Sequence, residues 1–63
     1  MKLIIYTKHK KSIKFENLTS DIISKFDDAY SKEYRNDSSF SIWDNERKIV
    51  IPFNEISYYE ITK

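Results

Sequence analysis

The chain lacks several residues that small proteins commonly use to stabilise a fold. Its 63 residues include no cysteine, no glycine, one proline and one histidine. Without cysteine there is neither a disulfide nor a cysteine-based metal site, and one histidine cannot build a histidine-rich site. We therefore expect no metal and no cofactor. A domain of this length buries only about 60% of the surface of its unfolded chain. We expect it to complete its core by self-association, as a homodimer.

The absence of glycine constrains the turns and excludes one class of ligand site. Glycine adopts a positive φ without steric cost, and asparagine and aspartate are the next most tolerant residues. We therefore expect turns in segments 36–39 and 44–46 and at Asn54, where these residues gather. A glycine-rich phosphate loop of the Walker or Rossmann type is excluded.

Long apolar runs are also missing. No stretch approaches the roughly 20 apolar residues that a membrane-spanning helix needs. The first fifteen residues contain no apolar run of the length found in a signal peptide. These features predict one small domain over residues 1–63, located in the cytoplasm and without a membrane partner.

Strand patterns occupy both ends of the chain. Residues 2–7 and 12–15 are rich in β-branched and aromatic residues and predict a hairpin with a polar tip. Residues 40–43 and 48–51 predict a second hairpin, and residues 56–61 predict a last strand. The strands therefore lie on both sides of a central segment.

That central segment has the pattern of a helix. Thr19 predicts an N-cap, and the spacing of Leu18 and Ile23 is that of a hydrophobic staple. Apolar residues then recur at helical spacing from Ser20 to about Tyr34. The chain is thus predicted to be an α+β domain of order β-β-α-β-β-β, with one amphipathic helix packed on an antiparallel sheet. The expected aromatic core consists of Phe15, Phe26, Tyr30, Phe40 and Phe53.

Candidate catalytic groups are few. His9 falls in the lysine-rich tip, where a general base is poorly held in register, so we interpret it as an exposed turn residue. Asp27 and Asp28 are adjacent on the predicted helix, and adjacent helical residues point about 100° apart. Asp28 also precedes Lys32 by four residues, a pairing typical of a solvated helix face. The sequence therefore predicts no enzyme.

Charge is segregated along the chain, although the formal net charge is only +1. The first fifteen residues carry five lysines and no acid, whereas residues 16–46 carry eight acids and three bases. A lysine cluster at the first hairpin provides candidate nucleic-acid contacts, with Tyr6 and Trp43 as rings that stack on bases. Solubility or protein contact is the alternative role. The cluster consists of Lys8, Lys10, Lys11 and Lys14.

Ten of the 63 residues are aromatic, more than the core requires. Trp43 falls on the strand face opposite Phe40 and Ile42, and Tyr58 and Tyr59 point to opposite faces of one strand. Trp43 and at least one of the two tyrosines should therefore lie off the core. Such residues are enriched at interface hot spots, so a second copy of the chain and a protein partner are both expected. The candidate protein-binding residues are Trp43, Tyr58, Tyr59, Asp27, Asp28, Asp44 and Glu46.

Several segments combine into a recognisable layout: a short N-terminal hairpin, LTSDIISKF at the start of the helix, then FSIW and KIVIPFNEISYYEI in strands. Residues with AT-rich codons (Phe, Tyr, Met, Ile, Asn, Lys) make up 33 of the 63. This layout and composition resemble those of tiny proteins of phages and mobile elements in low-GC Gram-positive bacteria. Many such proteins bind and block a host or rival protein, including defence components. The resemblance implies a non-enzymatic inhibitor acting by direct contact in the host cytoplasm. The alternative is a small nucleic-acid-binding module that uses the lysine cluster.

Overall fold

The part of the chain that the structure describes forms one helix and five strands. The computed structural model describes residues 1–32 and 38–63, with the exception of the Asp44 side chain. In these residues the order is β-β-α-β-β-β, so the predicted α+β class is confirmed. The elements are β1 (Lys2–Thr7), β2 (Ser12–Phe15), α1 (Ser20–Ser31), β3 (Ser39–Asp44), β4 (Arg47–Pro52), the 3₁₀ turn η1 (Phe53–Glu55) and β5 (Ile56–Thr62).

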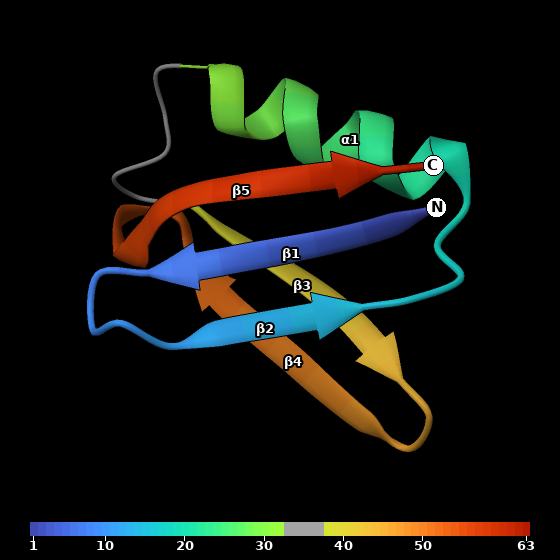
Figure 1. Cartoon of the computed structure of the whole chain (residues 1–63), viewed down its shortest axis with the longest axis horizontal. Helices are drawn as coiled ribbons and strands as arrows, with labels where there is room; N and C mark the ends of the chain where they lie inside the picture. The colour runs from blue at the N-terminus through green and yellow to red at the C-terminus, as the bar shows by residue number, and fades with distance from the viewer. Residues whose placement is uncertain (33–37) are drawn as a thin grey trace.

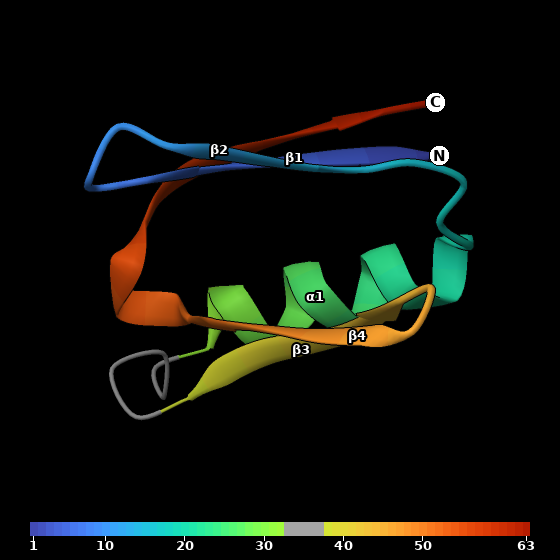
Figure 2. The ribbon, with the colours of Figure 1, turned by 90° about the horizontal axis from the view of Figure 1, so that it is seen from below.

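The five strands are divided between two antiparallel sheets rather than joined in one. The first sheet has the order β2-β1-β5, and the second is the β3-β4 hairpin. Figure 2 shows the first sheet as one layer, with α1 and the β3-β4 hairpin in the other. In Figure 1 the hairpin crosses behind β1 and β2, and α1 runs beside it.

The division arises at η1, where the chain passes from one layer to the other. Pro52 cannot donate a hydrogen bond to a ladder, and β4 ends there as its pattern predicts. The N–H of Phe53 donates to the carbonyl of Ser38 at 2.9 Å, and the N–H of Lys8 donates to that of Glu55 at 2.9 Å. These two bonds fix the crossing to both layers.

The core lies between the layers and is centred on Phe26, which is 1% exposed. Its ring packs edge-to-face on Phe40 of β3 at 4.8 Å, on Phe53 of η1 at 5.9 Å and on Tyr59 of β5 at 4.7 Å between centroids. One helical residue thus connects α1 with both sheets. The buried core comprises Leu3, Ile5, Phe15, Ile23, Phe26, Ile51, Phe53 and Ile56.

The predicted aromatic core is confirmed. Phe15, Phe26 and Phe53 are buried, and Tyr30 and Phe40 are partly buried against them. Tyr59 also packs on this cluster, with its ring 5.0 Å from that of Tyr30.

The helix begins as predicted. Thr19 is extended (φ −77°, ψ 158°) and its Oγ1 accepts a hydrogen bond from the N–H of Ile22 at 3.3 Å. This bond satisfies one of the free donors of the first turn. Leu18 and Ile23, the predicted staple, both pack into the core cluster.

The helix ends at Ser31, earlier than the predicted Tyr34. Lys32 is already extended (φ −83°, ψ 162°) and its N–H donates to the carbonyl of Ala29 at 3.3 Å. The Ser31 hydroxyl donates to the carbonyl of Asp27 at 2.8 Å, a back-bond that weakens a helix locally. The remaining predicted residues, 33–34, lie outside the described part.

Turns without glycine use positive φ at Lys10 (64°), Asn17 (59°) and Asn45 (61°). Asn45 confirms the turn predicted at 44–46, while residues 36–37 of the other predicted turn lie outside the described part. Asn54 lies in η1, at the predicted corner. Lys10 was not expected, because lysine has no special tolerance of the left-handed region.

Replacing Phe26 by alanine is expected to unfold most of the protein. The loss is about 3–5 kcal/mol for a buried phenylalanine, which equals what a core of this size usually supplies. Trp43→Ala removes an aromatic ring from the surface and is expected to cost less than about 1 kcal/mol. Urea denaturation followed by far-ultraviolet circular dichroism measures both variants. A Phe26→Ala variant as stable as Trp43→Ala would contradict the central role of Phe26.

Candidate functional site

Each sheet has one face that the opposite layer does not cover (Figure 2). Among the described residues, the most exposed large apolar side chains lie on these two faces. Trp43 is 66% exposed and Val50 53% exposed on the β3-β4 hairpin, and Tyr58 is 55% exposed on the three-stranded sheet. We call these the Trp43 face and the Tyr58 face.

The Trp43 face adjoins an apolar groove of about 570 Å³ between α1 and β3. A second hollow of about 280 Å³, beside the segment that joins β2 to α1, shares Ile22, Ile42 and Trp43 with this groove. Trp43 therefore stands between two hollows. The apolar groove residues are Ile22, Phe26 and Ala29 from α1, and Phe40, Ile42 and Trp43 from β3.

None of the predicted acidic contact residues whose side chains the structure describes is among the residues that line this groove. Asp28 on α1 and Glu46 in the turn after β3 are exposed. The backbone of Asp44 belongs to β3, and its side chain lies outside the described part. Asp27 accepts a hydrogen bond at Oδ1 from the hydroxyl of Tyr59. Asp27 and Tyr59 thus have a structural role, because they connect α1 with β5.

The tyrosine of this pair titrates abnormally. Partial burial of Tyr59, followed by its hydrogen bond to Asp27 and the charge of that carboxylate, raises the pKa of Tyr59 from 10.0 to about 12. Each cause disfavours the phenolate, because an anion loses solvent there and meets another anion.

This raised pKa predicts a loss of stability at high pH. The unfolded chain releases the Tyr59 proton near pH 10.0, whereas the folded chain keeps it until about 12. The stabilisation is therefore complete below pH 10.0 and disappears as pH rises towards about 12. Urea midpoints measured across this window should fall more steeply for the wild type than for Tyr59→Phe. The other ionisable groups are the same in both proteins and cancel in this comparison. An equal fall of the urea midpoint with pH in both proteins would therefore contradict the assignment of this effect to Tyr59.

The Tyr58 face carries a stacked pair of rings. Tyr6 of β1 and Tyr58 of β5 are register partners, with ring centroids 4.3 Å apart and planes inclined by 15°. A hydrogen bond from the Tyr6 hydroxyl to Glu60 is the largest cause that raises the pKa of Tyr6. Glu60 is therefore the partner of the Tyr6 hydroxyl on this face.

The predicted lysine cluster lies at the end of this face. A hollow of about 500 Å³ is lined by Lys8, Lys10 and Lys11 together with both rings of the pair. Lys14 lies apart from these three: it is the register partner of Ile4 and lines the hollow beside Trp43. All four lysines are exposed. The Tyr58 face therefore combines two rings with a basic end.

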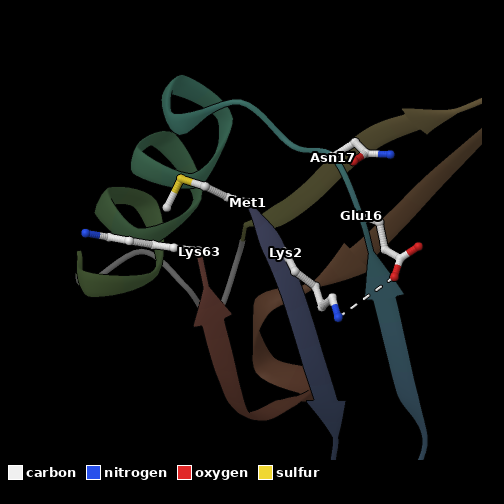
Figure 3. Close-up of a pocket in the computed structure, with 5 residues that line it drawn as sticks. All are labelled: Met1, Lys2, Glu16, Asn17 and Lys63. Atoms are coloured by element: carbon white, nitrogen blue, oxygen red, sulfur yellow. Dashed lines mark ion pairs between the residues drawn. The ribbon is translucent and has the colours of Figure 1, made fainter.

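Another hollow, of about 280 Å³, lies at the opposite end of the three-stranded sheet, where the two chain ends meet. Figure 3 shows that its side chains point apart rather than into a common space. Lys2 turns towards Glu16, with Nζ 3.9 Å from Oε1. This arrangement does not gather groups for chemistry.

His9 lies in the exposed tip, as predicted, with 76% of its side chain accessible. Its Nε2 lies 3.1 Å from Oε2 of Glu55. In residues 1–32 and 38–63 no three histidine or acidic side chains are grouped to hold a metal ion. No helix in the same ranges has the length and apolar character needed to cross a membrane.

The predicted contact residues do not form one continuous surface. Trp43 and Tyr58 lie on the outer faces of different layers, while Tyr59 faces the core. Alternation within a strand identifies which residues point outwards. It does not reveal that Tyr6 meets Tyr58, because their pairing depends on the register between β1 and β5.

Comparison with protein-family models, curated proteins and solved structures gave no match to this chain. Its function is therefore argued from the two faces.

Proposed function

We propose that this chain is a non-enzymatic binding protein that acts by direct contact with another protein through the Trp43 face. The observation that supports this proposal is the 66% exposure of Trp43 beside an apolar groove. The resemblance in layout to small phage and mobile-element proteins supports an inhibitor that blocks a host defence protein in the bacterial cytoplasm.

Trp43 contributes little to the stability of the fold. A tryptophan side chain buries about 150–250 Å² when covered, and most of the Trp43 side chain remains in water. Tryptophan is among the residues most enriched in interface hot spots. Covering Trp43 would therefore add apolar burial that the isolated chain does not obtain.

The groove beside Trp43 is suited to an extended segment of a partner. Within the described residues β3 pairs only with β4, so its other edge carries no strand. Such an edge offers backbone donors and acceptors to an added strand, while adjacent pockets receive alternate side chains. Phe26, Phe40 and Ala29 provide the apolar wall of this groove.

Polar residues surround the apolar centre, as at many protein interfaces. Lys25 lines the groove, and Asp28 and Glu46 are exposed nearby in the chain. Such rim charges steer association and select partners more than they add affinity. We propose that these two acids select a partner with a basic rim.

Self-association is proposed for the same face. A chain of 63 residues without a disulfide has a thin margin of stability. A second copy that covers Trp43 and Val50 would extend the core across a dimer interface. The partner protein would then compete with the second copy for Trp43.

The proposed function predicts that capture of a partner depends on Trp43. The folded chain, immobilised and exposed to a bacterial lysate, is expected to retain one protein in stoichiometric amount. Trp43→Ala should reduce retention by at least about 30-fold, since truncating a hot-spot residue costs about 2 kcal/mol or more. Lys10→Gly, at the other end of the molecule, is the matched control and should retain the same protein. Circular dichroism verifies that each bait is folded.

Retention that survives Trp43→Ala, or that is lost in Lys10→Gly, would contradict this assignment. Retention of nothing by a folded wild-type bait would contradict the proposed function itself.

A further inference from the structure

We propose that the Tyr58 face binds single-stranded nucleic acid, with Tyr58 stacking on a base and the hairpin lysines contacting phosphates. This site is separate from the Trp43 face and does not depend on the function proposed for it. Three features of the face support the proposal: the arrangement of the rings, the distribution of charge and the conformation of Lys10.

The rings offer one open stacking surface. Tyr6 and Tyr58 lie nearly parallel at 4.3 Å, so each covers one side of the other. β5 is the edge strand of its sheet, and Tyr58 is 55% exposed. A base can therefore extend the stack beyond Tyr58. Tyr6 backs the other side of the Tyr58 ring. Stacking of this kind accepts any base, because every base has a π-face.

The charge next to the rings is positive. Lys8, Lys10 and Lys11 line the same hollow as Tyr6 and Tyr58. Within the described residues no ion pair involves these three lysines. Glu55, whose carbonyl accepts from the N–H of Lys8, has Oε2 3.1 Å from Nε2 of His9. The lysines are thus available to phosphates. Glu60 also lies on this face, two residues along β5 from Tyr58 and away from the tip.

The tip is a tight loop that brings the backbone of Lys8, Lys10 and Lys11 close together. The N–H of Lys10 donates to the carbonyl of Thr7 at 3.1 Å, and the N–H of Thr7 donates to that of Lys11 at 2.8 Å. This is a three-residue hairpin loop whose third residue is left-handed, a position that normally carries glycine. Here Lys10 occupies it at φ 64°. Elsewhere in the described residues, positive φ occurs at Asn17 and Asn45, and asparagine tolerates this region.

A side chain that is kept at a strained position suggests a role for that side chain. Lys10 occupies the left-handed site between Lys8 and Lys11, so its ammonium group adds to theirs. The lining hydroxyls of Ser12 and Ser57 add donors for phosphate or sugar oxygens. Lysines alone would equally suit an acidic peptide. The exposed stacked ring beside them favours nucleic acid.

Binding is tested by fluorescence anisotropy with labelled oligothymidylate of about ten nucleotides, within the range of single-strand sites. Contacts from three or four lysines predict a slope of roughly −2 to −3 in log affinity against log salt. Affinity should therefore fall roughly 20- to 50-fold between about 50 and about 200 mM salt. A single-stranded RNA of equal length distinguishes DNA from RNA as the ligand, and binding of either supports the site.

Two variants separate stacking from charge. Tyr58→Ala is expected to weaken binding roughly 5- to 150-fold with no change in salt slope. Tyr58→Phe keeps an aromatic ring and should recover the affinity that Tyr58→Ala loses. Polyphosphate carries the charge but has no bases. It should bind with a similar salt slope, and Tyr58→Ala should not change its affinity.

Lys10→Gly is expected to change stability and binding in opposite directions. Removing the left-handed strain should raise the urea midpoint. Loss of one phosphate contact should weaken oligonucleotide binding about eightfold at about 50 mM salt, and reduce the slope by about 0.7. Asn17→Gly is the backbone control, because Asn17 has φ 59° and lies at the opposite end of the sheet (Figure 3). Lys63→Ala, at the same opposite end, is the charge control.

Three results would overturn the proposal. The first is no binding of either oligonucleotide at about 50 mM salt. The second is binding that Tyr58→Ala leaves unchanged while its fold is intact, which would make the tip a general basic patch. The third is equal binding of a polyglutamate peptide, which would make the ligand an acidic protein segment.

Discussion

The packing of one helical ring, Phe26, is the interaction on which the rest of the structure depends. The two sheets have no strand in common, so backbone hydrogen bonding within a ladder cannot join the layers. Phe26 contacts rings from β3, η1 and β5 and is 1% exposed. The hydrogen bond between Tyr59 and Asp27 connects the same helix to β5. Phe15 of β2 adds a direct contact between the sheets, with its ring edge-to-face on Phe40 of β3 at 6.2 Å between centroids.

A core of this kind uses the inner faces of both sheets and leaves the outer faces unused. Residues on the inner faces form the core, and the outer residues Trp43, Val50 and Tyr58 remain exposed to water. Because the chain is so short, two thin layers expose two broad faces on opposite sides. The functional proposals follow from this geometry. Each face has its own chemistry, apolar around Trp43 and basic with aromatic rings around Tyr58, so each suits a different kind of partner.

Local features of this fold were predictable from the sequence, whereas long-range ones were not. The N-cap at Thr19 and the alternation of faces around Trp43 depend on neighbouring residues, so the sequence predicts both correctly. The helix ends at Ser31, before the predicted residue, and the apolar spacing that predicts the helix does not indicate this end. The division into two sheets and the meeting of Tyr6 with Tyr58 depend on the crossing at η1 and on register. Because the division into two sheets is not visible in the sequence, alternation marks Trp43 and Tyr58 as candidate exposed residues but does not assign them to separate faces.

The central claim is that the fold is complete with Trp43 open to solvent until another polypeptide covers it. Because Trp43 is the only tryptophan, quenching of its fluorescence by acrylamide tests this claim most directly. In dilute, folded protein the quenching constant should approach that of the urea-unfolded chain, and it should fall as protein concentration rises and a second copy covers the ring. Strong shielding of Trp43 in dilute monomer would show that the ring is packed into its own core, and would contradict the claim.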